Sequence, residues 1–414
     1  MELMENKRQQ QRPIKTELML FFIIVALTGF GAGMSDNTIS NFFKDAYNVT
    51  AVQRGFLEFP REFPGILLFL IVAITSAFGD VRLAIVAQSL TALGALILGL
   101  FTPPFALMVV FLFINSMGMH LYMPLQDSIG MSIIGQENLG RRMGQYNGIR
   151  TACMMLASVL IFFGFRTGFF SFQTQLKLPF IIATAAFIGV ALLYFTLYTK
   201  YRVYGEARKK HIQIIIKKEY RFYYILAVLY GVQKQIMFVF GPWVLIEILS
   251  KQADTLALLG IMSSFLGVFL LPAIGRWLDR FGPKKLLLIE GSLFVLVYTT
   301  YGLLSGGFTR GTIAKAGIPV LFTCGLFVFD RLTMQLGMVR TAYLRSIATD
   351  PADITPTLST GMSMDHVVSI ICAYLGGITW SSFGPQYVFF IAATLSLLNV
   401  AVALRIKPAV KAAP

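Results

Sequence analysis

The sequence of 414 residues is poor in charged residues, cysteine and histidine. Only 13% of its residues are charged, against roughly 25% in a soluble globular chain, so there are too few charges to cover a water-soluble body. The three cysteines (Cys153, Cys324 and Cys372) lie in apolar runs, which excludes a disulfide scaffold. In place of charge the chain has apolar residues, 56% of the total, with a mean hydropathy of +0.70. A polytopic membrane protein is therefore expected, and disorder and nucleic-acid binding are excluded.

The chain also lacks the short motifs of catalytic and nucleotide-binding sites. It has no H-E-x-x-H pattern, no Walker loop and no paired C-x-x-C. The missing nucleotide site argues against an ATP-driven pump. The missing nucleophile constellation argues against an intramembrane hydrolase, so no enzyme activity and no cofactor are expected. A receptor or scaffold that transports nothing stays open as a third class.

Apolar stretches long enough to cross a bilayer recur along the whole chain. A transmembrane helix needs about 20 mostly apolar residues. Twelve such stretches are present, at 18–43, 52–78, 83–101, 105–133, 143–166, 178–199, 222–248, 255–276, 285–305, 316–344, 358–382 and 386–404. The sequence therefore predicts an all-α integral membrane protein of twelve transmembrane helices.

The longest hydrophilic interruption, residues 200–221, divides these twelve helices into two sets of six. It holds eight basic residues and two acidic ones, as is typical of a cytosolic segment at the lipid headgroups. Most of the formal net charge of +15 has the same explanation. We expect a cytosolic tail (1–17), an N-terminal six-helix bundle (18–199), a basic cytosolic linker (200–221), a C-terminal six-helix bundle (222–404) and a second cytosolic tail (405–414). The expected location is the plasma (inner) membrane, and the expected state is a monomer.

The two halves match weakly but in register. Gly29 on the first span corresponds to Gly231 on the seventh, and Gly148 on the fifth corresponds to Gly361 on the eleventh. Residues 119–123 on the fourth span likewise correspond to residues 334–338 on the tenth. Matches at three corresponding spans predict a duplicated bundle with parallel repeats.

The loop after the eighth span carries the most specific pattern, Gly-Arg-Trp-Leu-Asp-Arg-Phe-Gly-Pro-Lys-Lys at residues 275–285. Its glycines permit a tight turn, and its trailing basic residues favour the inner leaflet. This loop resembles the G-x-x-x-D-R-x-G-x-[RK]-[RK] signature of the major facilitator superfamily. The resemblance implies two six-helix bundles that rock around a central cavity lined by spans one, four, seven and ten. It assigns a gating role to Gly275, Asp279, Arg280, Gly282, Lys284 and Lys285, and to Arg141 and Arg142 in the loop between spans four and five. Arg340 is added to this gating set because its charge lies toward the cytosolic side.

Charged side chains inside a bilayer are costly, so each is a candidate functional residue. Lys234 is the first choice for a substrate contact, because no acid lies beside it on its own helix and it falls near the bilayer midplane. Asp127 and Arg150 form either a static salt bridge or a substrate contact like that of the proton-coupled sugar symporters of the superfamily. The expected substrate-binding residues are Lys234, Arg331, Arg61, Arg150, Asp127, His120, Gln233 and Gln235.

Proton coupling needs a carboxylate or imidazole that changes its protonation state with occlusion. The candidates are Asp36, Glu62, Asp365, His366 and Asp330. Asp365 has an alternative role as a gate latch with Arg340, and Glu290 is expected to be structural. Histidines and carboxylates also suggest a transition-metal site, but their spacing fits no recognised ligand pattern.

Taken together, these features predict a secondary active transporter that works by alternating access. The midplane excess of cations favours a small, polar, anionic organic solute, and protons are the expected coupling ion in a symport. Proton-driven efflux of drugs or metabolites is the alternative, although the fifth span lacks the Gly-Pro-rich motif of the drug/proton antiporters. A divalent-metal carrier is the third reading.

Overall fold

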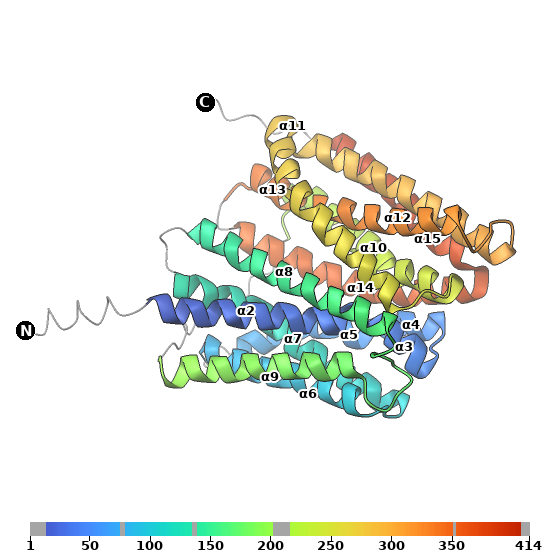
Figure 1. Cartoon of the computed structure of the whole chain (residues 1–414). Helices are drawn as coiled ribbons and strands as arrows, with labels where there is room; N and C mark the ends of the chain where they lie inside the picture. Colours follow the sequence, from blue (N-terminus) through green and yellow to red (C-terminus); the bar gives the residue numbers. More distant parts are fainter. Residues whose placement is uncertain (1–13, 75–78, 135–138, 202–215, 351–352, 407–414) are drawn as a thin grey trace, which may run out of the picture. The chain divides into compact units, whose positions relative to one another are not determined.

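The computed structural model of the chain describes residues 14–74, 79–134, 139–201, 216–350 and 353–406. Within these ranges all regular structure is helical (Figure 1). Ten of the helical segments are long and apolar enough to cross a membrane. The expectation of an all-α membrane protein is therefore confirmed.

Two helices, α11 and α5, account for the difference between these ten segments and the twelve predicted spans. Helix α11 (Ala253–Arg310) bends at Gly282, whose φ of +75° is left-handed, so its 58 residues supply two spans. Helix α5 (Glu58–Ile74) has 17 residues and is followed by residues outside the described ranges. It supplies the remaining span, which accounts for twelve transmembrane helices.

The described chain divides into two compact units, Met1–Thr38 with Leu67–Lys210 and Ile39–Ile66 with His211–Pro414. The expected six-helix bundles on either side of residues 200–221 stay a prediction, and residues 202–215 of that linker lie outside the described ranges. Each unit is described below by itself.

The first unit contains five long helices and the second half of α5. In this unit α6 packs against α7 and α9, and α2 packs against α8 and α9. Gly94 allows the close approach of α6 and α7, because a Cβ atom there would lie 2.6 Å from the Asn115 Cβ. The long helices are α2 (Ile14–Asp36), α6 (Asp80–Leu100), α7 (Phe105–Ile134), α8 (Leu139–Arg166) and α9 (Leu178–Thr199).

The second unit contains the remaining helices and the first half of α5. Here α10 packs against α14 and α15, α11 packs against α12 and α15, and the short α4 packs against α14. Its elements are α3 (Ile39–Tyr47), α4 (Ala51–Phe56), η1 (Lys218–Tyr220), α10 (Arg221–Trp243), η2 (Val244–Ile248), α11, α12 (Ile318–Thr333), η3 (Met334–Gly337), α13 (Met338–Ile347), α14 (Ile354–Phe383) and α15 (Pro385–Arg405).

Three predicted spans are interrupted where the sequence suggested continuous helices. The first span ends as α2 at Asp36 and resumes as α3, and the second begins as the separate helix α4, which Thr50 and Gln53 start with a capping box. The tenth span passes through a 3₁₀ turn at Met334–Gly337. Such interruptions inside a membrane are tolerated where neighbouring helices cover the backbone.

Candidate functional site

Most of the predicted intramembrane charges of the second unit lie in one group. The charge cluster, as we call it, contains Arg54, Glu58, Arg61, Glu62, Lys234, Arg331, Asp365 and His366. Its members come from α4, α5, α10, α12 and α14. Elements far apart in the sequence therefore bring four cations and four carboxylates or imidazoles into one polar region of a helical unit.

Lys234 of α10 and Asp365 of α14 form an ion pair across the helix interface. Gly231, one turn before Lys234, makes room for this pair, because the Asp365 carboxylate lies where a side chain of residue 231 would begin. The pair is partly accessible, with 33% of the Lys234 side chain and 21% of the Asp365 side chain exposed. An accessible ion pair can exchange its partner for a ligand, which a fully buried pair cannot do readily.

Glu62 of α5 and His366 of α14 form a second pair beside the first, with 2.7 Å between the Glu62 Oε2 and the His366 Nδ1. Gly65 allows the imidazole to approach α5, since a Cβ there would lie 2.6 Å from the His366 Cε1. The Lys234 ammonium interacts electrostatically with both Asp365 and Glu62. The two pairs are thus coupled through Lys234.

Glu58 anchors the cluster and was missed by the sequence analysis, as was Arg54. The Glu58 carboxylate lies 2.5 Å from the Arg54 Nη1 and 2.7 Å from the Arg61 Nη1, and its other oxygen accepts a hydrogen bond of 3.0 Å from the Gln235 Nε2. Arg54 and Glu58 are fully buried. Their i, i+4 and i, i+3 spacing is the signal that could have identified this triad.

Phe238 of α10 is shared by two cations. The guanidinium carbon of Arg61 lies 5.1 Å from the Phe238 ring centroid, and that of Arg331 lies 5.6 Å from the same centroid. Arg331 also lies 5.1 Å from the Phe327 centroid on its own helix. Cations over aromatic faces are held by the ring quadrupole, which fixes them without using their N–H donors.

Arg331 is the cation of the cluster that has no acceptor. Within the described residues its guanidinium makes ring contacts but no ion pair and no hydrogen bond. The neighbouring Asp330 is 1% exposed and interacts with the Tyr298 hydroxyl, and it forms no ion pair with Arg331 within the described residues. Adjacent helical residues point about 100° apart, so they do not satisfy each other.

Gln233, a predicted substrate contact, and Arg340, a predicted gating residue, are both engaged in buried contacts. The Gln233 side chain donates to the Ser396 Oγ and accepts from the Asn399 Nδ2, both at 2.9 Å. Arg340, considered for a latch with Asp365, instead pairs with Glu290 at 2.7 Å, since Lys234 occupies Asp365. The expected structural role of Glu290 agrees with this buried pairing.

In the first unit, the structure shows no salt bridge between the described side chains of Asp127 and Arg150. Asp127 accepts a hydrogen bond from the Tyr146 hydroxyl rather than from Arg150, whose Nε is buried without a partner. His120 forms a hydrogen bond of 2.9 Å between its Nδ1 and the Ser116 carbonyl oxygen. Asp36 is the last residue of α2.

Six of the predicted gating residues lie at or near the bend of α11. The bend is at Gly282, which has a left-handed backbone conformation, and five further gating residues lie within seven positions of it: Gly275, Asp279, Arg280, Lys284 and Lys285. The Lys284 Nζ donates a hydrogen bond of 2.8 Å to the Leu404 carbonyl oxygen. The side chains of Arg141 and Arg142 lie outside the part that the structure describes.

A family model and several solved structures each match most of the chain. The model of the Major Facilitator Superfamily matches residues 21–349. A crystal structure of the nucleoside transporter NupG is similar at a TM-score of 0.72 and 13% identity, over 94% of this chain and 98% of that one. A D-xylose-proton symporter is similar at 0.67 and 14% identity, over 95% and 98%. A bacterial homologue of the iron transporter ferroportin is similar at 0.69 and 12% identity, over 95% and 99%. No curated protein sequence matches significantly.

Proposed function

Because the chain belongs to the Major Facilitator Superfamily and is a multi-pass membrane transporter, we propose that it carries a small organic anion by alternating access, coupled to protons. The observation that carries this proposal is Arg331, a partly buried guanidinium held over Phe238 and Phe327 with no acceptor among the described residues. A desolvated cation with free N–H donors is a binding site for an anion.

Lys234 is the second substrate contact in this proposal. The anion competes with Asp365 for the accessible Lys234 ammonium. When Lys234 turns to the substrate, Asp365 loses its cationic partner, and we assign to this carboxylate the proton that is carried with the anion. Binding of an anion and uptake of a proton therefore support each other, as a symporter requires.

Glu62 and His366 supply a second protonation site beside the first. The Glu62–His366 contact is short, and Lys234 interacts electrostatically with Glu62 as well as with Asp365. A proton on His366 adds positive charge next to Lys234 and strengthens the field that attracts the anion. We propose that Asp365, Glu62 and His366 together couple protons, with Asp330 and Asp36 as further candidates.

We further propose that the protein lies in the plasma (inner) membrane with both termini in the cytosol. The basic segment of residues 200–221 and the basic bend of α11 support this orientation, because basic loops prefer the cytosolic side. The two six-helix bundles and their boundary at this segment belong to the same proposal.

Uptake into proteoliposomes tests the function. Purified protein is first screened by thermal shift against organic anions, sugars, amino acids, divalent metals and cationic dyes. Compounds that stabilise it are then tested for uptake with and without an inward proton gradient. We expect organic anions to stabilise the protein and the gradient to accelerate their uptake. Stabilisation by hydrophobic cations alone, with uptake unaffected in Lys234→Ala, would contradict the proposal.

A further inference from the structure

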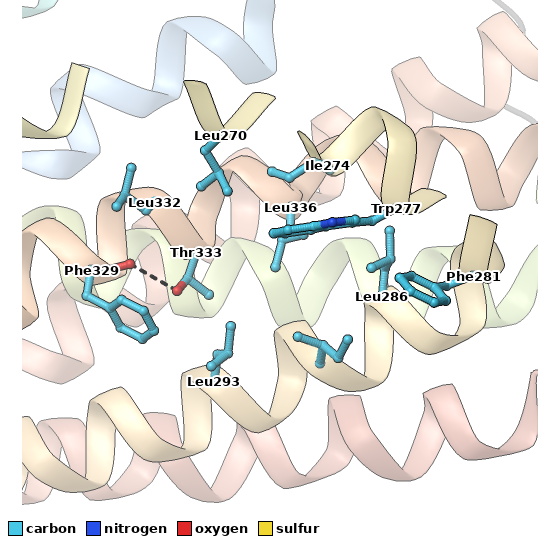
Figure 2. A pocket seen from close by; sticks show the side chains of 11 residues that line it. Leu270, Ile274, Trp277, Phe281, Leu286, Leu293, Phe329, Leu332, Thr333 and Leu336 are labelled. Carbon is cyan, nitrogen blue, oxygen red and sulfur yellow. Dashed lines mark hydrogen bonds between the residues drawn. The ribbon is translucent and has the colours of Figure 1, made fainter. Parts of the chain in front are cut away.

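An apolar groove lies on the second unit, away from the charge cluster. It has a volume of about 470 Å³ and is formed by the two halves of α11 together with α12 and η3 (Figure 2). All of its lining residues except Thr333 are apolar, and the Thr333 hydroxyl is already bonded to the Phe329 carbonyl oxygen at 3.0 Å. Apart from the indole N–H of Trp277, the groove therefore offers no free polar group to a ligand.

Large hydrophobic side chains around this groove are exposed. Trp277, Phe281, Ile289 and Phe329 all line it and keep between 39% and 48% of their surface accessible. Trp277 and Phe281 lie at one end, and Phe329 and Leu332 lie at the other (Figure 2). On a membrane-spanning helix such surface is covered by hydrocarbon chains, so the groove suits an acyl chain.

One end of the groove carries positive charge. The Arg280 guanidinium and the Lys285 ammonium lie 5.2 Å and 5.8 Å from the centroid of Phe281, a lining residue. Neither cation has an ion-pair partner within the described residues. Arg276 and Lys284 flank the same bend, and Asp279 is the one acidic residue of residues 275–285. The groove is thus apolar along its length and cationic at its Phe281 end.

We propose that this groove binds an anionic phospholipid, with one acyl chain between the halves of α11 and α12 and the phosphate against Arg280 and Lys285. Trp277 supports this placement, because tryptophan prefers the boundary between hydrocarbon and headgroup. Basic pockets between transmembrane helices bind anionic headgroups electrostatically. A zwitterionic lipid fills the groove equally well but gains little from these cations.

Quenching of Trp277 by brominated acyl chains tests the site directly. The chain has three tryptophans, and Trp243→Phe with Trp380→Phe leaves Trp277 as the single reporter. The full chain is reconstituted in nanodiscs with brominated phosphatidylglycerol or brominated phosphatidylcholine in an unbrominated background. We expect phosphatidylglycerol to reach half-maximal quenching at an about tenfold lower mole fraction. If the double variant does not fold, the difference between the parent and Trp277→Phe gives the same signal.

Two charge variants separate specific headgroup binding from general attraction. Arg280→Gln with Lys285→Gln removes the cations at Phe281, and we expect it to abolish the preference for phosphatidylglycerol. The matched control, Lys218→Gln with Arg221→Gln, removes two exposed cations, one in η1 and one at the start of α10, and is expected to keep the preference. Equal quenching by both lipids in the parent, or the same loss in the control, overturns the proposal. A Trp277 that no brominated chain reaches also overturns it, because protein would then cover the groove.

Discussion

Arg331 lies over the ring of Phe238, with its guanidinium carbon 5.6 Å from the ring centroid. Arg61 reaches the same ring from α5. One phenylalanine of α10 thus holds two cations that come from different helices, without using their N–H donors. The ring contact leaves the N–H donors of Arg331 available to an anion. Arg331 and Arg61 were both named from the sequence, but their shared contact with Phe238 was not predicted.

Removing the Phe238 ring should weaken anion binding. Each cation–π contact contributes about 0.5–2 kcal/mol, so Phe238→Leu should raise the Kd for the anion by about 2- to 30-fold. Isothermal titration with an anion from the thermal-shift screen measures this change. Phe265→Leu is the matched control, because Phe265 is an exposed phenylalanine on α11 of the same unit. An unchanged Kd in Phe238→Leu would show that the Phe238 ring does not hold Arg331 and Arg61 for anion binding.

Asp365→Asn should separate substrate binding from proton coupling. The amide cannot hold Lys234 as a carboxylate does, so Lys234 becomes more available and the Kd for the anion should stay constant or fall. The acceleration of uptake by a proton gradient should be lost, because asparagine takes up no proton. Parallel binding and uptake assays check both effects. A variant that binds poorly yet still responds to the gradient contradicts the assigned roles.

The Arg340–Glu290 pair should matter for stability. Both side chains are buried, and Arg340 also lies 3.5 Å from the centroid of Tyr230. Removing one partner of a buried pair leaves an uncompensated charge, so Glu290→Gln should cost about 3–5 kcal/mol of unfolding free energy. Replacing both residues, as in Glu290→Leu with Arg340→Met, should restore much of the loss. Denaturant titration in detergent measures all three proteins, and a double variant as unstable as the single one speaks against a charge effect.

The contact of α4 with α14 should tolerate no side chain at Gly377. A Cβ there would lie 2.6 Å from the Ala51 carbonyl oxygen and 2.9 Å from the Val52 Cα. Gly377→Val should therefore detach α4 and raise labelling of a cysteine placed at the buried Ser40. Gly260→Val is the control, since nothing lies within 4 Å of a Cβ at that position. Equal labelling in the two variants would show that the close contact is unimportant.

The start of α10 gives a prediction of pH dependence. Hydrogen bonds from Lys217 and from Tyr220, the latter at 2.7 Å, hold the pKa of Asp353 below its usual 3.8. The hydrogen bond to Asp353 in turn raises the pKa of Lys217 above its usual 10.5. The stabilisation by Asp353 is present above pH 3.8 and is lost as the pH falls through its lowered pKa. The stabilisation by Lys217 is present below pH 10.5 and is lost as the pH rises through its raised pKa.

Asp353→Asn should consequently lower the Tm by an amount that is constant from about pH 5 to about pH 9. Below pH 3.8 the difference from the parent should shrink, because the parent loses the same charge. Differential scanning fluorimetry at several pH values measures this. A difference that grows on acidification would have the wrong sign for a carboxylate with a lowered pKa.

The fold was largely predictable from the sequence, because a membrane helix is recognised from a local run of apolar residues. The bend of α11 was likewise indicated by its glycines and basic residues. The breaks between α2 and α3 and at η3 were not, since they depend on neighbours that cover the backbone. Lys234, Asp365, Glu62 and His366 were each named from their charge, but their pairing was not predictable across 131 and 304 residues of sequence. Phe238 was missed because 37 phenylalanines share its chemistry and only the fold singles it out.

The measurement closest to the central claim is the affinity of the transported anion for an Arg331 charge series. Isothermal titration compares the parent with Arg331→Lys, Arg331→Gln and the control Arg310→Gln, which removes an exposed cation at the end of α11. Losing a charge-assisted hydrogen bond costs about 1.5–3 kcal/mol, so Arg331→Gln should raise the Kd by about 10- to 150-fold. Arg331→Lys should give a smaller increase and Arg310→Gln none. An unchanged affinity in Arg331→Gln would contradict the account.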